Sequence, residues 1–191
     1  MRVVALVAAT TLAAGCSSSE PAAPRSTATT APKGIDLPAG VTLTKGGTSG
    51  LKVGTPATAV YQLGDRAASA VTVTIADVTK GTMEDFRFFS LDEATKKSTP
   101  YYVKVGVKNE GPAGLGGAAL PIYALDSTRT SLPPNDIVGT FKPCPNPTLP
   151  ESFLPGAAAE LCLVYLIPEG RKLTAVTLQT GSTADAITWG G

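Results

Sequence analysis

Tyr-Tyr-Val-Lys-Val-Gly-Val-Lys, at residues 101–108, is the stretch of sequence that decides the fold. Valine occupies every second position from Val103 to Val107, and lysine or glycine fills the positions between. A period of two puts the valines on one face of a strand and the polar residues on the other. Residues 71–76, Val-Thr-Val-Thr-Ile-Ala, repeat this pattern. Both stretches therefore predict half-buried antiparallel strands.

A different kind of strand is expected at residues 161–167, Leu-Cys-Leu-Val-Tyr-Leu-Ile, because both of its faces are apolar. Such a strand is typical of the centre of a sheet, where both faces are covered. Weaker strand patterns occur at residues 55–63, 121–125, 173–179 and 186–189. Six or seven short strands with glycine and proline turns between them predict an all-β, antiparallel β-sandwich over residues 51–191.

Residues 83–97 fit this pattern least well. Their aromatic half is expected to continue a strand, and Asp-Glu-Ala-Thr-Lys-Lys at 92–97 is expected to form one helical turn. We expect the aromatic side chains to plug one end of the sandwich. Trp189 is expected to close the core, and the glycine-rich residues 111–117 lack the Lys-Ser/Thr of a phosphate loop and predict a turn.

The N-terminus has the pattern of a targeting signal. Arg2 precedes an apolar run at residues 3–12, which has the length of a signal-peptide core. The run ends in Leu12-Ala13-Ala14-Gly15-Cys16, which resembles the lipobox of bacterial lipoproteins. The resemblance implies a signal peptide at residues 1–15, cleavage between Gly15 and Cys16, and lipid on the Cys16 thiol. The protein is then exported and anchored to the outer face of the bacterial cell membrane, because two acyl chains suffice for stable attachment.

Residues 16–50 are predicted to be a lipidated N-terminus followed by a flexible tether. Ser17 to Lys33 contain almost only Ser, Thr, Ala and Pro, a composition typical of linkers that cannot bury a core. Gly46 to Gly50 form a second flexible stretch, so the folded unit is expected to begin near Leu51.

Composition argues against several functions. The chain has 16 basic and 15 acidic residues, so nothing favours nucleic acid as a partner. It has no histidine, which removes Ser-His-Asp and Cys-His nucleophiles and the usual nitrogen ligand of zinc and copper. Carboxylates at Glu84, Asp85, Asp92 and Glu93 share a loop with basic residues and predict a solvated charged loop. We expect neither an enzyme nor a bound metal or cofactor, although a calcium site at Asp77, Glu84 and Asp85 is a minor hypothesis.

Three cysteines divide into Cys16 and a distal pair, Cys144 and Cys162. In an exported protein the pair is expected to form a disulfide, worth roughly 3 kcal/mol for a loop of this length. The bridge would fix residues 132–155, where 7 of 24 positions are proline. Two interpretations of this loop stay open. Phe141 and Phe153 could form an apolar contact surface, or the loop could be irregular chain that covers a sheet edge.

A family resemblance follows from two motifs. The strand at 101–108 continues into Asn109-Glu110-Gly111, and Leu154-Pro155-Gly156 leads into the strand ending at Pro168. This order resembles the immunoglobulin-like domains of exported lipoproteins related to the immunoprotective extracellular antigen of mycobacteria. The resemblance implies an immunoglobulin-like sandwich and an exported location, without a reaction. We therefore expect a non-enzymatic module that binds a protein or a cell-envelope component, or alternatively a solute-binding or transporter-accessory lipoprotein. Oligomeric state is left open.

Overall fold

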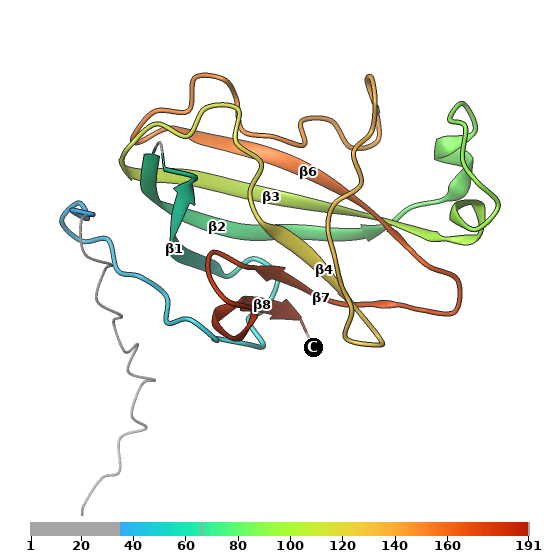
Figure 1. Cartoon of the computed structure of the whole chain (residues 1–191), viewed down its shortest axis with the longest axis horizontal. Helices are drawn as coiled ribbons and strands as arrows, with labels where there is room; N and C mark the ends of the chain where they lie inside the picture. The colour runs from blue at the N-terminus through green and yellow to red at the C-terminus, as the bar shows by residue number, and fades with distance from the viewer. Residues whose placement is uncertain (1–34, 66, 191) are drawn as a thin grey trace, which may run out of the picture.

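Two antiparallel sheets of four strands each make up the fold (Figure 1). The structure is a computed structural model that describes residues 35–65 and 67–190. The strand order is β1-β2-β3-β6 in the first sheet and β5-β4-β7-β8 in the second. The elements, including three short 3₁₀ helices, are β1 (Pro56–Leu63), β2 (Ala67–Lys80), η1 (Met83–Phe86), η2 (Thr95–Lys97), β3 (Thr99–Pro112), β4 (Ile122–Asp126), β5 (Ser131–Leu132), β6 (Ala158–Ile167), β7 (Leu173–Leu178), η3 (Thr183–Asp185) and β8 (Ile187–Gly190).

The predicted all-β class is confirmed, and so are the strands predicted outside residues 83–97. The alternating valines of β3 pack into the core between the sheets, and so do Val71, Val73 and Ile75 of β2. A β-bulge at Ala76 shifts the β2–β3 register, after which Asp77 pairs with Lys104. Each strand thus presents its apolar face to the second sheet because the side chains of a strand alternate.

Two aromatic side chains connect the sheets by hydrogen bonds across the core. The Tyr165 hydroxyl of β6 donates to the backbone carbonyl of Ile122 in β4 at 2.8 Å. The indole N–H of Trp189 in β8 donates to the carbonyl of Thr55, next to β1, at 2.7 Å. Both rings are buried, and Trp189 closes the core as the sequence predicts. Burial of these polar groups costs little because each has a partner.

Strand β6 is an edge strand, which corrects the prediction of a central strand at residues 161–167. It pairs with β3 on one side only. Leu161, Leu163 and Tyr165 face the main core, whereas Cys162 and Val164 belong to a second cluster on the outer face. Both faces of β6 are apolar because one face packs in the main core and the other packs in this second cluster.

Contacts of the folded unit begin before the predicted boundary at residue 51. Residues 43–51, here called the N-terminal strap, run along the edges of β1 and β8. Leu43 is buried. Thr188 of β8 donates its N–H to the Thr48 carbonyl at 2.9 Å and accepts from the Leu51 N–H at 3.0 Å. Hydrogen bonds to β8 thus hold the backbone around residues 46–50, although its glycines predict a flexible tether.

The two motifs that carry the family resemblance meet in space at the end of β3. Asn109 is fully buried, and its side-chain amide donates to the carbonyls of Ala113 at 2.8 Å and Phe153 at 3.2 Å. Its side-chain oxygen accepts from the Ser69 hydroxyl at 2.6 Å. Its backbone carbonyl accepts from the Gly156 N–H at 2.7 Å. Asn109 therefore joins the loop after β3 to the loop before β6.

Residues 113–117 form an irregular turn after the end of β3, close to the predicted position, and β4 follows them. Gly116 lies so close to the backbone of Glu151 that a Cβ at this position would overlap its carbonyl oxygen. Glycine is required here for close packing of two chain segments rather than for phosphate binding.

Candidate contact surface

A disulfide between Cys144 and Cys162 attaches residues 132–155, here called the proline-rich loop, to the outer face of β6, in agreement with the predicted pairing. The two Cα atoms lie 5.1 Å apart, and both residues are buried. The side chain of residue 162 points outward because its neighbours Leu161 and Leu163 point into the main core. The bridge therefore fixes the loop on the side of the sheet that faces away from the sandwich interior.

Under this loop lies a second hydrophobic core. Phe141 is at its centre, with its ring stacked on Phe86 at a centroid distance of 4.8 Å. Phe89 and Tyr102 each approach the Phe141 ring edge-on at 5.8 Å. Offset and edge-to-face pairs of this kind add to the stabilisation that burial alone provides. Val164 of β6 and the two cysteines complete the cluster.

The two residues predicted to form a contact surface are both inside the protein, which corrects that prediction. Phe141 is 5% exposed in the second core, and Phe153 is 1% exposed in the main core. Phe141 is buried because the loop is held against an outer sheet face that is itself apolar, whereas Phe153 packs into the core between the sheets. Leu154 and Val138 are instead the exposed apolar residues of the loop, at 61% and 93%.

The loop also covers the free edge of β6, as the second interpretation predicts. Asn135 donates its backbone N–H to the Val164 carbonyl at 2.7 Å, and its side-chain oxygen accepts from the Leu166 N–H at 2.8 Å. The Cys162 N–H donates to the Asn146 carbonyl at 3.1 Å. An edge whose groups are paired in this way no longer offers a template for other strands.

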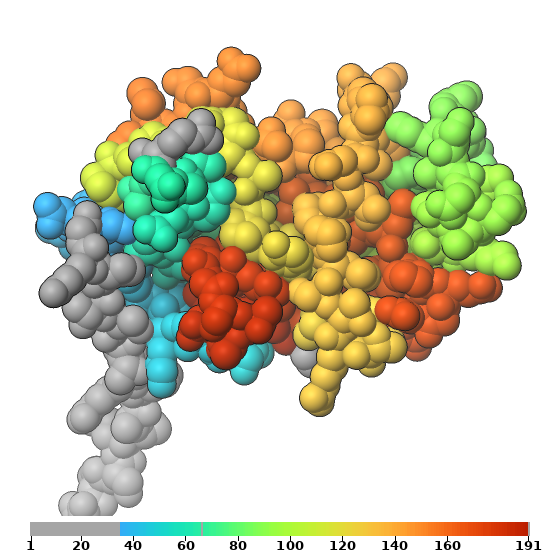
Figure 2. Space-filling model, in the orientation of Figure 1, coloured from blue at the N-terminus to red at the C-terminus, as the bar shows by residue number. Residues whose placement is uncertain are grey.

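Residues 83–97 form a projecting tip. The strand predicted in its aromatic half is wrong, because η1 lies there instead, whereas the helical turn predicted at residues 92–97 is present as η2. Phe86 and Phe89 pack on the outer face of the sheet instead of plugging the end of the sandwich. Figure 2 shows the tip, in green, at one end of the molecule and the orange proline-rich loop beside it. The tip thus contributes Phe86 and the partly buried Met83, Phe89 and Leu91 to the second core.

Phe88 is the exposed aromatic side chain of this tip, at 84% exposure. The guanidinium carbon of Arg87 lies over its ring, 4.5 Å from the centroid, as in a cation–π contact. A hollow of about 360 Å³ between tip and loop is lined by both residues and by Lys142, which makes no ion pair with another described residue. This arrangement can place an aromatic ring into a partner while Lys142 attracts an acidic group.

The four carboxylates of the tip each have a local partner. Glu84 pairs with Arg87 at 3.5 Å and Glu93 with Lys96 at 2.6 Å. Asp92 accepts from the N–H and hydroxyl of Thr95 at 2.8 and 2.9 Å. These contacts support the prediction of a charged, solvated loop over that of an acid–base pair.

Asp85 and Tyr102 form the polar contact between the tip and β3. The Tyr102 hydroxyl donates to the carboxylate at 2.8 Å. This bond is the main reason why the pKa of Asp85 is lowered, and hydrogen bonds from Thr82 add to it. Burial, followed by the bond to Asp85, raises the pKa of Tyr102.

Asp77, the third carboxylate of the calcium hypothesis, accepts a hydrogen bond from Thr79. No group of three potential metal ligands occurs within residues 35–65 and 67–190.

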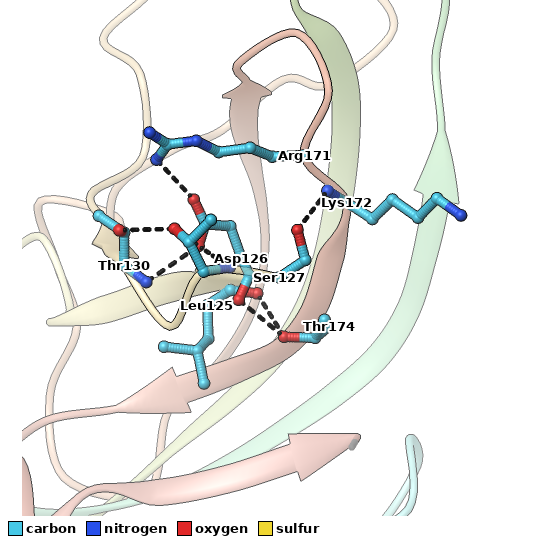
Figure 3. Close-up of polar contacts among 8 residues, drawn as sticks. Leu125, Asp126, Ser127, Thr130, Arg171, Lys172 and Thr174 are labelled. Carbon is cyan, nitrogen blue, oxygen red and sulfur yellow. Dashed lines mark hydrogen bonds and ion pairs between the residues drawn. The ribbon is translucent and has the colours of Figure 1, made fainter.

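A buried carboxylate that the sequence did not single out organises the β4–β5 turn (Figure 3). Asp126 pairs with Arg171, from the loop before β7, at 2.9 Å, and accepts from the Thr130 N–H at 2.9 Å. Thr128 donates to it through both its N–H and its hydroxyl. Burial alone would raise the pKa of Asp126, but these hydrogen bonds and Arg171 lower it well below its usual range. The signal in the sequence is Asp-Ser-Thr-Arg-Thr, a typical side-chain-bonded turn.

Gly15 and Cys16, the predicted cleavage and lipidation site, lie outside the described residues. Among the described residues, no helix is long and apolar enough to cross a bilayer. Comparisons with family models, with curated proteins and with solved structures find no match to this chain.

Proposed function

We propose that this chain is an exported bacterial lipoprotein, held by lipid on Cys16 at the outer face of the cell membrane, whose domain binds a protein partner and catalyses no reaction. The motif Leu12-Ala13-Ala14-Gly15-Cys16 supports the anchor. The disulfide between Cys144 and Cys162 supports export independently, because such bonds persist in oxidising compartments.

The domain is, in this proposal, immunoglobulin-like. With β1 set aside, the strands β2-β3-β6 follow the order A-B-E of that fold, and β5-β4-β7-β8 follow C′-C-F-G. Strand D of the constant-type domain has no counterpart among the described strands, and β1 is an addition to the A edge. The order of seven strands therefore supports the architecture that the sequence motifs suggested.

The exposed ring of Phe88 is the observation that carries the binding role. It projects from a tip whose base is fixed by Phe86, Phe89 and the disulfide-bonded loop. Figure 1 places this tip, in green, at the opposite end of the long axis from residues 35–45, in blue. A chain attached through its N-terminus can hold this end away from the bilayer. The matching partner is a protein with an apolar pocket beside an acidic side chain, which would meet Lys142.

The proposal that the domain catalyses no reaction is based on the polar side chains of the described residues. No buried side-chain nitrogen or oxygen atom of the described residues lacks a hydrogen-bond partner. The carboxylates of the tip are engaged locally, and the whole sequence has no histidine.

Capture from a solubilised cell envelope by the purified chain tests the binding role. Phe88→Ala is expected to weaken capture of the specific partner about tenfold, since a buried aromatic anchor carries much of an interface's affinity. Val53→Ala is the matched control, because Val53 is also exposed but lies outside the tip and the proline-rich loop. Equal capture by both variants would contradict the assignment of the tip.

The alternative function, a solute-binding lipoprotein, has one observation in its favour. A hollow of about 230 Å³ lies beneath the proline-rich loop, against Phe141, Cys144 and Val164. Thermal-shift measurements with sugars, peptides and metal ions discriminate, since a ligand at 100 times its Kd adds about 2.7 kcal/mol of stability. No shift across the panel would dispose of the alternative.

A further inference from the structure

Most of the described sheet edges are covered or very short. The proline-rich loop bonds to the edge of β6 through Asn135 and Asn146, and the strap bonds to the edge of β8 through Thr48 and Leu51. Strand β5 has only two residues. Proteins manage sheet edges in these ways because unpaired backbone groups recruit other strands. The edge of β1 differs from the other three.

Among the described residues, only Thr44 covers the edge of β1, at Thr58. The Thr58 carbonyl accepts from the Thr44 N–H at 2.8 Å, and the Thr58 N–H donates to the Thr44 hydroxyl at 3.0 Å. Both backbone groups of Thr58 thus point away from β2. Since these directions alternate along an antiparallel strand, the N–H and C=O groups of Val60 and Gln62 point to the same free side. No other described residue pairs with them there.

A hollow of about 310 Å³ opens beside this free stretch, between β1 and β8. Its floor is formed by the buried residues Leu43, Ala59 and Ile187, and the small side chain of Ala59 leaves the space open. Asp185 is the charged residue of its lining. Its carboxylate accepts from the Ser182 hydroxyl at 2.7 Å and has no cationic partner among the described residues.

We propose that the edge of β1 at Val60 and Gln62 binds an extended peptide segment as an additional strand, with a lysine or arginine side chain of the peptide seated in the hollow against Asp185. Strand addition supplies affinity through main-chain hydrogen bonds and specificity through side-chain pockets. The aliphatic stem of lysine or arginine packs on the apolar floor while its charged end stays at the rim. Asp185 favours this cation by its charge. The inference does not depend on the lipid anchor or on the tip.

Amide hydrogen exchange of the full chain, followed by NMR, tests the edge itself. The amides of Val60 and Gln62 are expected to exchange much faster than those of Ala59 and Tyr61, which face β2. If Val60 and Gln62 are protected in the free full chain, its own N-terminal residues occupy the edge and the proposal is overturned.

The second step adds a defined probe, an end-capped six-residue peptide that alternates threonine and valine around a central lysine. Binding is expected to slow exchange at Val60 and Gln62, and a peptide with norleucine in place of lysine is expected to bind about threefold more weakly, as for a partly exposed ion pair. Asp185→Asn should abolish this difference, whereas the exposed control Asp65→Asn should preserve it. Equal binding of both peptides to the unaltered chain, or protection away from β1, would overturn the proposal.

Discussion

Two hydrophobic cores lie on opposite faces of the same pair of strands, β3 and β6. The main core, here called the inner core, contains Val103 and Leu163 and is closed by the second sheet. The second core, here called the outer core, contains Tyr102 and Val164 and is closed by the tip, the proline-rich loop and the disulfide. Secondary structure thus builds one core, and loops held by a covalent bond build the other. The difference suggests that the inner core carries global stability, whereas the outer core positions the tip.

Replacing one buried phenylalanine in each core tests this comparison most strongly. Phe153→Ala is expected to lower the free energy of unfolding by about 4 kcal/mol and Phe141→Ala by about 3 kcal/mol, because large-to-small changes leave a cavity. Urea denaturation measures both. Leu154→Ala, at an exposed neighbouring position, should stay within about 0.5 kcal/mol. A larger loss for Phe141→Ala than for Phe153→Ala would contradict the ranking of the two cores.

Removal of the disulfide is expected to have the next largest effect. The paired change Cys144→Ala and Cys162→Ala opens a loop with a sequence separation of 18, and the chain-entropy model predicts a loss of about 3 kcal/mol. Hydrogen exchange should accelerate at Leu166, on the covered edge of β6, and stay slow at Val105 in the inner core. Uniform acceleration across both sheets would show that the two cores unfold as one unit.

A smaller effect is expected from the edge cover alone. Asn135→Ala removes the side-chain oxygen that accepts from the Leu166 N–H, and loss of one such bond costs about 1 kcal/mol. The Leu166 amide should then exchange faster, and the urea midpoint should fall slightly. Asp136→Ala is the matched control on the adjacent exposed residue. If both variants behave alike, the bond from Asn135 does not hold the loop to β6.

The smallest effect concerns acid. The hydrogen bond from Tyr102 lowers the pKa of Asp85 in the folded state, so its carboxylate adds stability above the unfolded pKa of about 4. This stability is lost as the pH falls through the folded pKa. Asp85→Asn should cost at most about 0.5 kcal/mol at neutral pH, because the carboxylate is partly exposed to solvent. The difference from the unaltered chain should vanish on acidification, as followed by thermal unfolding at several pH values.

The sequence predicts the inner core well and the outer core poorly, for one physical reason. Alternation is a local signal, so residues 71–76 and 101–108 reveal which face is buried. The outer core joins residues 83–91 to residues 137–144 through topology alone, and no local pattern records that contact. One of the two interpretations of the proline-rich loop therefore placed Phe141 on a contact surface, although it is buried in the outer core. The same interpretation placed Phe153 there, although it is buried in the inner core.

Residues 161–167 show the same limit in another form. Their apolar character on both faces is real, but its cause is the loop cover outside the sheet, and not a central position within it. The strap at 43–51 was missed because its glycines are typical of a linker, while its cover of β8 depends on backbone hydrogen bonds that any sequence can make.

Mass spectrometry of the chain isolated from the membrane fraction of a bacterium that expresses it tests the proposed anchor most directly. The expected result is a mature N-terminus at Cys16, with residues 1–15 removed and a diacylglyceryl thioether on the Cys16 sulfur. A chain that retains residues 1–15, or one that carries an unmodified Cys16 thiol, would contradict it.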